Sequence, residues 1–113
     1  MPALSIATDK YGRGYGRATN MEPASTKVLR DEIADIDAQI IDLLATRMDI
    51  TDELAKAKKA SGQSAWDDDV EKRIVSRYNE LCQEVNLTKE EADQIARLIL
   101  SISKERQMRI YNE

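Results

Sequence analysis

Residues 26–61, TKVLRDEIADIDAQIIDLLATRMDITDELAKAKKAS, decide the fold of this chain. Apolar residues recur there at intervals of three and four, which is typical of an amphipathic α-helix with one buried stripe. The stripe consists of Leu29, Ile33, Ile36, Ile40, Leu44, Thr51, Leu54 and Ala55. A helix from an N-cap at Ser25 or Thr26 to Gly62 holds about 36 residues and spans about 54 Å, longer than a compact domain of this size is wide. We therefore expect a second copy of the chain to cover the stripe.

Two cations lie on the same stripe, where core residues belong. At 100° per residue, Arg47 and Lys58 fall within about 20° of the direction of Ile40. Burying an unpaired cation costs several kcal/mol, so each side chain must either reach water or face a buried anion. Reaching water would pair them with surface carboxylates such as Asp49 or Glu53. Facing inward would let them hold a small dianion between them.

The composition is that of a single helical domain. The chain has 113 residues, with one Trp, four Tyr and no Phe, and its net charge of −4 argues against nucleic-acid binding. Histidine is absent and Cys82 is the only cysteine, which argues against structural zinc, an intrachain disulfide and histidine-based catalysis. No apolar run approaches the roughly 20 residues that cross a bilayer, and the N-terminus lacks the apolar segment of a signal peptide. We therefore expect a cytoplasmic protein without a membrane partner.

The chain divides into a tail and one helical domain. Residues 1–25 hold three of the four glycines and both prolines and have no sustained periodicity, which predicts a disordered tail. Met21 is an alternative start of translation. Residues 26–113 are expected to form an all-α domain with a long, a short and a medium helix.

Capping motifs mark the start of the two later helices. Asp68 and Glu71 form a capping-box-like start for a helix of about 17 residues. Thr88 and Glu91 form a second capping box, which opens a last helix over about 89–111. The buried faces of these helices are predicted to contain Val70, Ile74, Leu81 and Val85, and Ile95, Leu98, Ile99 and Ile102.

Polar residues on or beside the apolar stripes are the candidate site residues. Leu100, Ser103 and Gln107 share one edge of the last helix, which therefore carries a hydroxyl and an amide. Arg30 lies 17 residues before Arg47, about 25 Å along the helix, so both arginines hold one small ligand only if Arg30 comes from a second chain. The candidates are Arg30, Arg47, Lys58, Glu71, Ser103 and Gln107.

The order and spacing of these residues resemble the all-α chorismate mutases. The similarity runs from Leu29 to about Gln107 without an insertion or deletion. It rests on Leu29-Arg30 followed by Ile33, Ile36 and Asp37, then Leu43-Leu44-Ala45-Thr46-Arg47, Lys56-Ala57-Lys58, Asp67 and Glu71, and Ser103 and Gln107. The resemblance implies an intertwined homodimer with the activity of an isomerase, which converts chorismate to prephenate in aromatic amino-acid biosynthesis without a cofactor or metal.

The resemblance also implies how the substrate is held. Arg30 of the partner subunit and Arg47 would each bind one substrate carboxylate, and Ser103 would assist at a carboxylate. Lys58 and Gln107 would donate hydrogen bonds to the ether oxygen of the breaking bond.

The choice of substrate depends on a second group of residues. Glu71, with the backbone near Asp67, would hold the ring hydroxyl. Val70 departs from the family pattern, since many members carry an arginine there, and this leaves the substrate open. An isochorismate-pyruvate lyase and a mutase of 4-amino-4-deoxychorismate are the alternative enzymes on the same fold. A dimeric helical interaction module without an active site is the alternative from another class, and a partner enzyme of the shikimate pathway is a further hypothesis.

Overall fold

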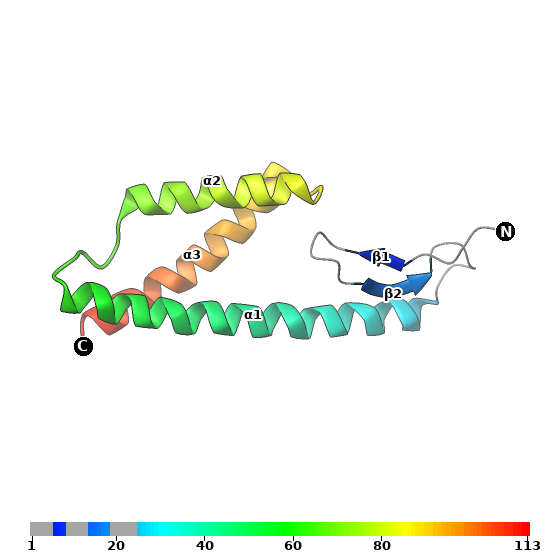
Figure 1. The fold of residues 1–113 in the computed structure, drawn as a ribbon, viewed down its shortest axis with the longest axis horizontal. Coiled ribbons are helices and arrows are strands. Elements are labelled where there is room, and N and C mark those ends of the chain that lie inside the picture. Colours follow the sequence, from blue (N-terminus) through cyan, green and yellow to red (C-terminus); the bar gives the residue numbers. More distant parts are fainter. Residues whose placement is uncertain (1–5, 9–13, 19–24) are drawn as a thin grey trace. The chain divides into compact units, whose positions relative to one another are not determined.

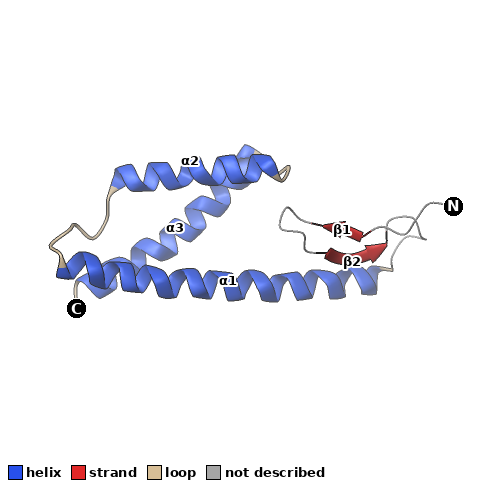
Figure 2. Cartoon of the chain, in the orientation of Figure 1, coloured by secondary structure: helices blue, strands red, loops and turns tan. Residues whose placement is uncertain are grey.

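The computed structural model describes residues 6–8, 14–18 and 25–113. These ranges contain three helices and a short antiparallel strand pair, shown in Figure 1: α1 (Thr26–Ala60), α2 (Asp68–Glu84), α3 (Lys89–Tyr111), β1 (Ile6–Thr8) and β2 (Gly14–Ala18). Helices joined by short connections account for residues 26–113 (Figure 2), so the predicted all-α class and the long first helix are confirmed. None of the helices in the described ranges combines the length and apolarity needed to cross a membrane.

The strand pair is an addition to the predicted fold. Ile6 pairs with Ala18 and Thr8 pairs with Gly14, with an irregular register between the two pairs. These strands lie in the segment that is predicted to be a disordered tail. The rest of the predicted disordered tail, including Met21, lies outside the described residues.

The long helix α1 begins and ends where the sequence predicts. At its start, the Val28 backbone N–H donates to the Ser25 hydroxyl at 3.2 Å, so Ser25 acts as the N-cap. At its end, Gly62 has φ of +73°, a left-handed conformation that glycine adopts without strain. Lys58 and Lys59 lie in the last turn, where positive charge interacts favourably with the helix dipole.

The start of α2 differs from the prediction by one residue. Asp67, not Asp68, is the N-cap, and its carboxylate accepts hydrogen bonds from the backbone N–H groups of Asp69 at 2.9 Å and Val70 at 3.4 Å. The one-residue difference has a simple cause, since several consecutive aspartates offer equivalent capping oxygens and sequence alone does not rank them. The Glu71 side chain is therefore not engaged in capping, which leaves its carboxylate for other contacts.

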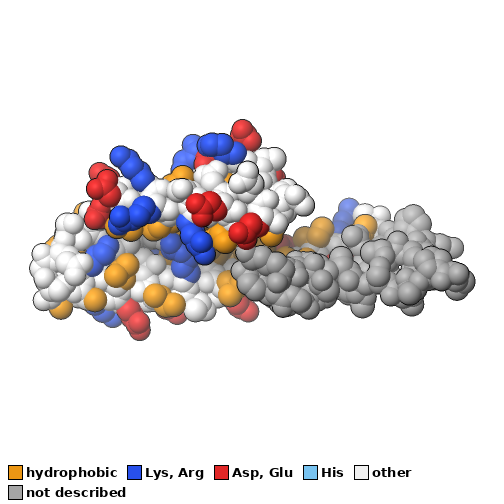
Figure 3. Space-filling model, turned by 45° about the horizontal axis from the view of Figure 1, so that its top comes forward, with side chains coloured by type: hydrophobic (Ala, Val, Ile, Leu, Met, Phe, Trp, Pro, Cys, Tyr) orange, Lys and Arg blue, Asp and Glu red, His pale blue; other side chains and the backbone are white. Residues whose placement is uncertain are grey.

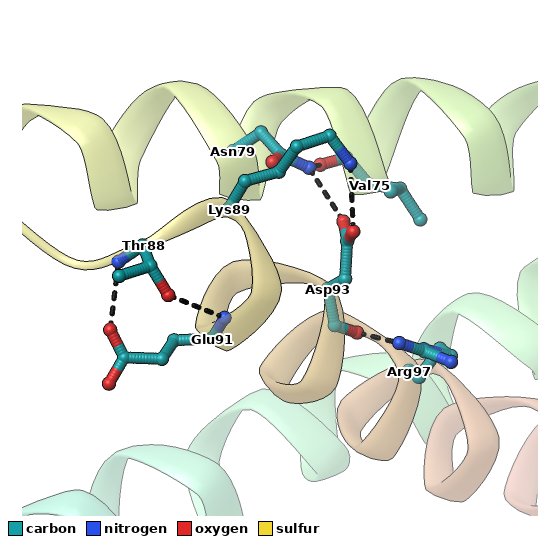
Figure 4. A network of polar contacts seen from close by, with 7 residues as sticks. All are labelled: Val75, Asn79, Thr88, Lys89, Glu91, Asp93 and Arg97. Carbon is teal, nitrogen blue, oxygen red and sulfur yellow. Dashed lines mark hydrogen bonds and ion pairs between the residues drawn. The ribbon is translucent and has the colours of Figure 1, made fainter.

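The turn between α2 and α3 is fixed by polar contacts (Figure 4). The predicted capping box is confirmed: Thr88 N–H donates to the Glu91 carboxylate at 2.8 Å, and Glu91 N–H donates to the Thr88 hydroxyl at 3.1 Å. Asp93 accepts hydrogen bonds from the Asn79 amide at 3.0 Å and from the Lys89 ammonium at 2.9 Å. Because Asn79 belongs to α2 and Asp93 to α3, the Asn79–Asp93 hydrogen bond holds the two helices together. The hydrogen bonds from Lys89 and Asn79 also lower the pKa of the Asp93 carboxyl.

The buried residues of the helices are few and mostly small. The face of α3 that is buried in this chain consists of Ala92, Ala96, Leu100, Ser103 and Gln107. Of the residues predicted to be buried, Ile74, Leu81 and Ile99 are partly buried in this single chain. Ile95, Leu98 and Ile102 are 38%, 62% and 39% exposed, and Val70 and Val85 of α2 are also exposed. The alanines allow the backbones of α2 and α3 to approach closely, and the larger residues occupy faces that a single chain does not cover.

The chain divides into two compact units within α1, Met1–Leu44 and Ala45–Glu113. The second unit contains the C-terminal part of α1 together with α2 and α3, and it holds the candidate site. Many large apolar side chains of α1 are exposed in this single chain, among them Ile33 at 56%, Ile40 at 48% and Leu54 at 47%. Figure 3 shows apolar side chains, in orange, at the surface of the helices among charged ones.

Candidate active site

A pocket of about 80 Å³ lies within the unit Ala45–Glu113, between side chains of α1, α2, α3 and the loop before α2. Six of the seven residues that the resemblance singles out line it: Arg47, Lys58, Asp67, Glu71, Ser103 and Gln107. The rest of the wall consists of Thr51, Leu54, Trp66, Val70, Ile74 and Leu100. The pocket therefore combines two cations, a hydroxyl, an amide and carboxylates with apolar walls.

Arg47 of α1 reaches the buried Ser103 of α3. Its Nη1 donates to Ser103 Oγ at 2.7 Å, and Ser103, which is only 2% exposed, donates its own proton to the Ile99 carbonyl at 2.7 Å. The serine hydroxyl is thereby oriented with a lone pair toward the guanidinium. The other N–H groups of Arg47 have no partner among the described residues, so they are left to bind an anion.

Lys58 makes an equivalent contact with Gln107. It lies about three turns after Arg47 on α1, and Gln107 lies about one turn after Ser103 on α3. Its ammonium donates to Gln107 Oε1 at 2.8 Å and to the Ala65 carbonyl at 3.3 Å. Gln107 is 5% exposed, and its Nε2 has no partner within the described part of the chain. Because the lysine occupies the oxygen of the amide, the two N–H donors of Gln107 remain for a ligand.

The cations of the pocket carry no neutralising partner. Arg47 and Lys58 contact a hydroxyl, an amide and a carbonyl, and neither forms an ion pair with a carboxylate among residues 25–113. The alternative in which they pair with Asp49 or Glu53 at the surface is therefore wrong. The hydroxyl, amide and carbonyl that contact the two cations are neutral, so these contacts orient the cations without cancelling their charge.

The loop between α1 and α2 forms one side of the pocket. Tyr111 near the end of α3 donates its hydroxyl proton to the Gln63 carbonyl at 2.7 Å, and this ties the loop to α3. Trp66, the last loop residue before the Asp67 cap, donates from its indole Nε1 to Glu71 Oε2 at 3.2 Å. The loop therefore positions the Glu71 carboxylate at the pocket wall.

Two differences separate this pocket from the predicted site. Arg30 is exposed near the start of α1 and does not line the pocket. Trp66 lines the pocket, but it is not among the candidate residues predicted from the sequence. The sequence signal that could have identified Trp66 as a pocket residue is its position next to a predicted helix start, because it is the only tryptophan of the chain.

The fold and pocket define a class of protein: a helical protein with a pocket lined by cations, carboxylates and buried amide and hydroxyl groups. Comparison with protein families specifies it further. The sequence model of the family described as chorismate mutase type II matches residues 29–108, and the chain belongs to this family. Neither the curated proteins nor the solved structures contain a match to the chain.

Proposed function

We propose that the protein is a chorismate mutase, an isomerase that converts chorismate to prephenate by a Claisen rearrangement without a cofactor. The observation that carries this proposal is the pair of contacts Arg47–Ser103 and Lys58–Gln107 at 2.7 and 2.8 Å, which aims two unneutralised cations into one pocket of a family member. The same proposal includes a role in aromatic amino-acid biosynthesis and the cytoplasmic location expected from the sequence.

The reaction requires the protein to bind the substrate and to stabilise charge, but not to react covalently with it. In the rearrangement a C–O bond of the ether breaks while a C–C bond forms within the same molecule, so no atom or proton is exchanged with the enzyme. Negative charge builds on the ether oxygen as the bond breaks, and the Lys58 ammonium and the Gln107 amide are the donors that would meet it. A millionfold acceleration requires about 8 kcal/mol, and charge-assisted hydrogen bonds contribute about 1.5–3 kcal/mol each, so a few such donors are sufficient.

The second task is to fold the substrate into its reactive conformation. Arg47 would bind one carboxylate with the N–H groups that Ser103 leaves unused. The Glu71 carboxylate, with the backbone near Asp67, would accept the hydrogen bond of the ring hydroxyl. Holding both ends of a flexible dianion in this way removes the entropy cost of reaching the chair-like geometry.

The site is completed in this proposal by a second copy of the chain. The pocket volume of about 80 Å³ is well below the roughly 300 Å³ at which small-molecule sites begin, so the single chain supplies only part of the wall. Arg30 of the partner subunit would supply the cation for the second carboxylate. The exposed apolar residues of α1 provide the surface over which two copies would pack.

The test is the loss of chorismate absorbance on mixing with purified protein, for the wild type and for two lysine variants. Lys58→Met keeps the length and helix propensity of the side chain but removes its charge, and we expect kcat/KM to fall about 10- to 150-fold. Lys56→Met is the matched control on the same helix, because Lys56 is exposed and does not line the pocket. No turnover above the uncatalysed rate by the wild type would overturn the proposal.

An isochorismate-pyruvate lyase is the second enzymatic candidate. It is favoured by Val70, an apolar residue of the pocket wall at a position where many mutases carry an arginine. Measuring pyruvate release from isochorismate beside the rearrangement of chorismate and of its 4-amino-4-deoxy analogue separates the three substrates. Glu71 is compatible with chorismate, since a carboxylate accepts a hydrogen bond from a ring hydroxyl.

A dimeric interaction module remains the candidate from another class, supported by the exposed apolar side chains of α1. In that case the pocket cations would have no ligand to bind. Arg47→Ala and Lys58→Ala would then leave the free energy of unfolding unchanged or increased, and no chorismate would be consumed. Retained fold together with lost turnover would instead support the enzyme.

A further inference from the structure

The loop before α2 places the only tryptophan of the chain in the pocket wall. Trp66 is partly buried and uses its single polar atom, Nε1, to donate to Glu71 Oε2 at 3.2 Å. The second carboxylate oxygen of Glu71 has no partner among the described residues. One oxygen is thus fixed by the indole, and the other remains for a ligand.

The ring face of Trp66 makes a second contact, with α3. The Lys104 ammonium lies 5.4 Å from the ring centroid, within the range of a cation–π contact. Lys104 follows the buried Ser103 on α3, whereas Glu71 lies in the first turn of α2. Trp66 therefore contacts both α2 and α3, two of the three helices that line the pocket, and its orientation is determined at both the ring and the N–H.

We infer that Trp66 is a positioning residue, which fixes the Glu71 carboxylate so that its second oxygen can accept a hydrogen bond from the ring hydroxyl of the substrate. This deepens the proposed function and rests on it for the identity of the hydroxyl. The geometry behind it is independent of substrate, because the indole donor and the carboxylate oxygen contact each other in the protein alone. An indole N–H is a donor only, so it orients a carboxylate without competing for the ligand's proton.

The first experiment tests the contact without any substrate. The single indole N–H gives one side-chain resonance in a ¹H–¹⁵N spectrum, and Glu71→Gln removes its charged acceptor. We expect this resonance to shift and its hydrogen exchange to become about tenfold faster. Glu80→Gln, at an exposed position of the same helix outside the pocket, is the matched control and leaves the resonance in place. An indole resonance that Glu71→Gln leaves unchanged overturns the inference, whatever the protein catalyses.

The second experiment tests whether Trp66 acts through Glu71. Trp66→Phe keeps an aromatic ring against Lys104 but removes the N–H. We expect kcat/KM for chorismate to fall about tenfold in the wild-type background and less than about twofold in the Glu71→Gln background. Equal losses in both backgrounds, or no loss in either, would mean that the indole fills space only, and would overturn the inference.

The two experiments keep this inference apart from the proposed function. If the indole resonance responds to Glu71→Gln while the protein consumes no chorismate, the contact stands and the proposed substrate is wrong. If chorismate is consumed while the indole resonance and the Trp66→Phe variant show no effect, the proposed function stands and the role of Trp66 is wrong.

Discussion

Ser103 and Gln107 occupy neighbouring turns of the buried face of α3, yet they serve the two cations differently. Ser103 accepts from Arg47, so Ser103→Ala would leave the guanidinium without its orienting partner. We expect KM for chorismate to rise about tenfold with little change in kcat, because the lost alignment affects carboxylate binding in both ground and transition states. Steady-state kinetics measure this, with Ser101→Ala, exposed on the same helix, as the control that keeps wild-type constants.

In the proposed mechanism Gln107 faces the bond that breaks. Its replacement is therefore expected to lower kcat and not to raise KM. Gln107→Leu removes the amide donor and also the oxygen that holds Lys58 at 2.8 Å. We expect kcat to fall about 100-fold, since both donors act on charge that develops only in the transition state. A Gln107→Leu enzyme that loses affinity but keeps its kcat would contradict this assignment.

At the scale of single residues, the sequence predicted which polar groups gather but not how each is held. Arg47 and Lys58 were visible because cations interrupt an apolar stripe, and helical periodicity predicts direction well. The role of Trp66 was not visible, because a loop has no periodicity and the Trp66–Glu71 contact depends on where the α2 cap falls. That cap lies at Asp67, one residue from the predicted position, and the shift decides whether Glu71 caps a helix or lines a pocket.

At the scale of helices, α1 and α3 are connected by a bidentate ion pair. Arg106 donates from Nε and Nη2 to the two carboxylate oxygens of Asp52, at 2.9 and 2.6 Å, and the arginine lowers the pKa of Asp52 below its ordinary 3.8. A carboxyl group with a lowered folded-state pKa stabilises the fold above the unfolded-state pKa, and this contribution is lost as the pH falls through the folded-state value. Asp52→Asn should therefore lower the urea midpoint at about pH 6, and the difference from the wild type should shrink as the pH falls below the ordinary carboxyl pKa.

The control for this ion pair is a second ion pair on α3, the helix that carries Arg106. Arg109 and Glu105 of α3 also pair, at 3.3 Å, but their side chains are 64% and 73% exposed. Glu105→Gln should leave the urea midpoint unchanged over the same pH range, since exposed pairs contribute little. All midpoints are compared at one protein concentration, because association would shift them. An Asp52→Asn effect that does not shrink as the pH falls toward full protonation of the carboxyl would mean that the lost contact is not electrostatic.

The α2–α3 turn supplies a second test at this scale. Thr88 is the N-cap of α3, and its hydroxyl accepts from the Glu91 N–H at 3.1 Å. Thr88→Ala should lower the free energy of unfolding by about 1 kcal/mol, the usual cost of removing such a cap. Thr88→Ser, which keeps the hydroxyl, should restore most of it in the same denaturation experiment. Chorismate turnover should remain unchanged in both variants, because Thr88 does not line the pocket.

Which face of a helix is buried was harder to predict than where the helix lies. The apolar pattern identified Ile95, Leu98 and Ile102 as buried, but the chain buries Ala92 and Ala96 instead. The apolar pattern alone does not distinguish a helix face that packs within one chain from a face that packs against a second chain. In α3 the face buried within the chain carries the small residues Ala92 and Ala96. The exposed isoleucines and leucines are therefore the part of the pattern that a single chain leaves unexplained.

At the scale of the whole molecule, dimerisation is the simplest account of that exposed surface. Ile40→Lys places a charge on the apolar stripe of α1, where the wild-type side chain is 48% exposed in the single chain. We expect this variant to sediment as a monomer and to lose chorismate turnover. Gln39→Lys, at the adjacent exposed position off the stripe, should remain dimeric and active. A wild-type protein that sediments as a monomer at micromolar concentration would contradict the proposed assembly.

The arrangement of sites across the two chains is tested by mixing inactive variants. If each site takes Arg47 from one chain and Arg30 from the other, a mixed dimer of Arg30→Ala and Arg47→Ala chains has one intact site and one site lacking both arginines. Random pairing makes half of the dimers mixed, so about a quarter of wild-type activity should return after co-refolding. Arg47→Ala mixed with Lys58→Ala is the matched control: both residues line the pocket of one chain, so every site stays defective and no activity returns. Activity that returns in the control pair would contradict this arrangement, and so would a lack of activity in the first pair when mixed dimers have formed. Either result would mean that the two chains do not contribute Arg30, Arg47 and Lys58 to each site as proposed.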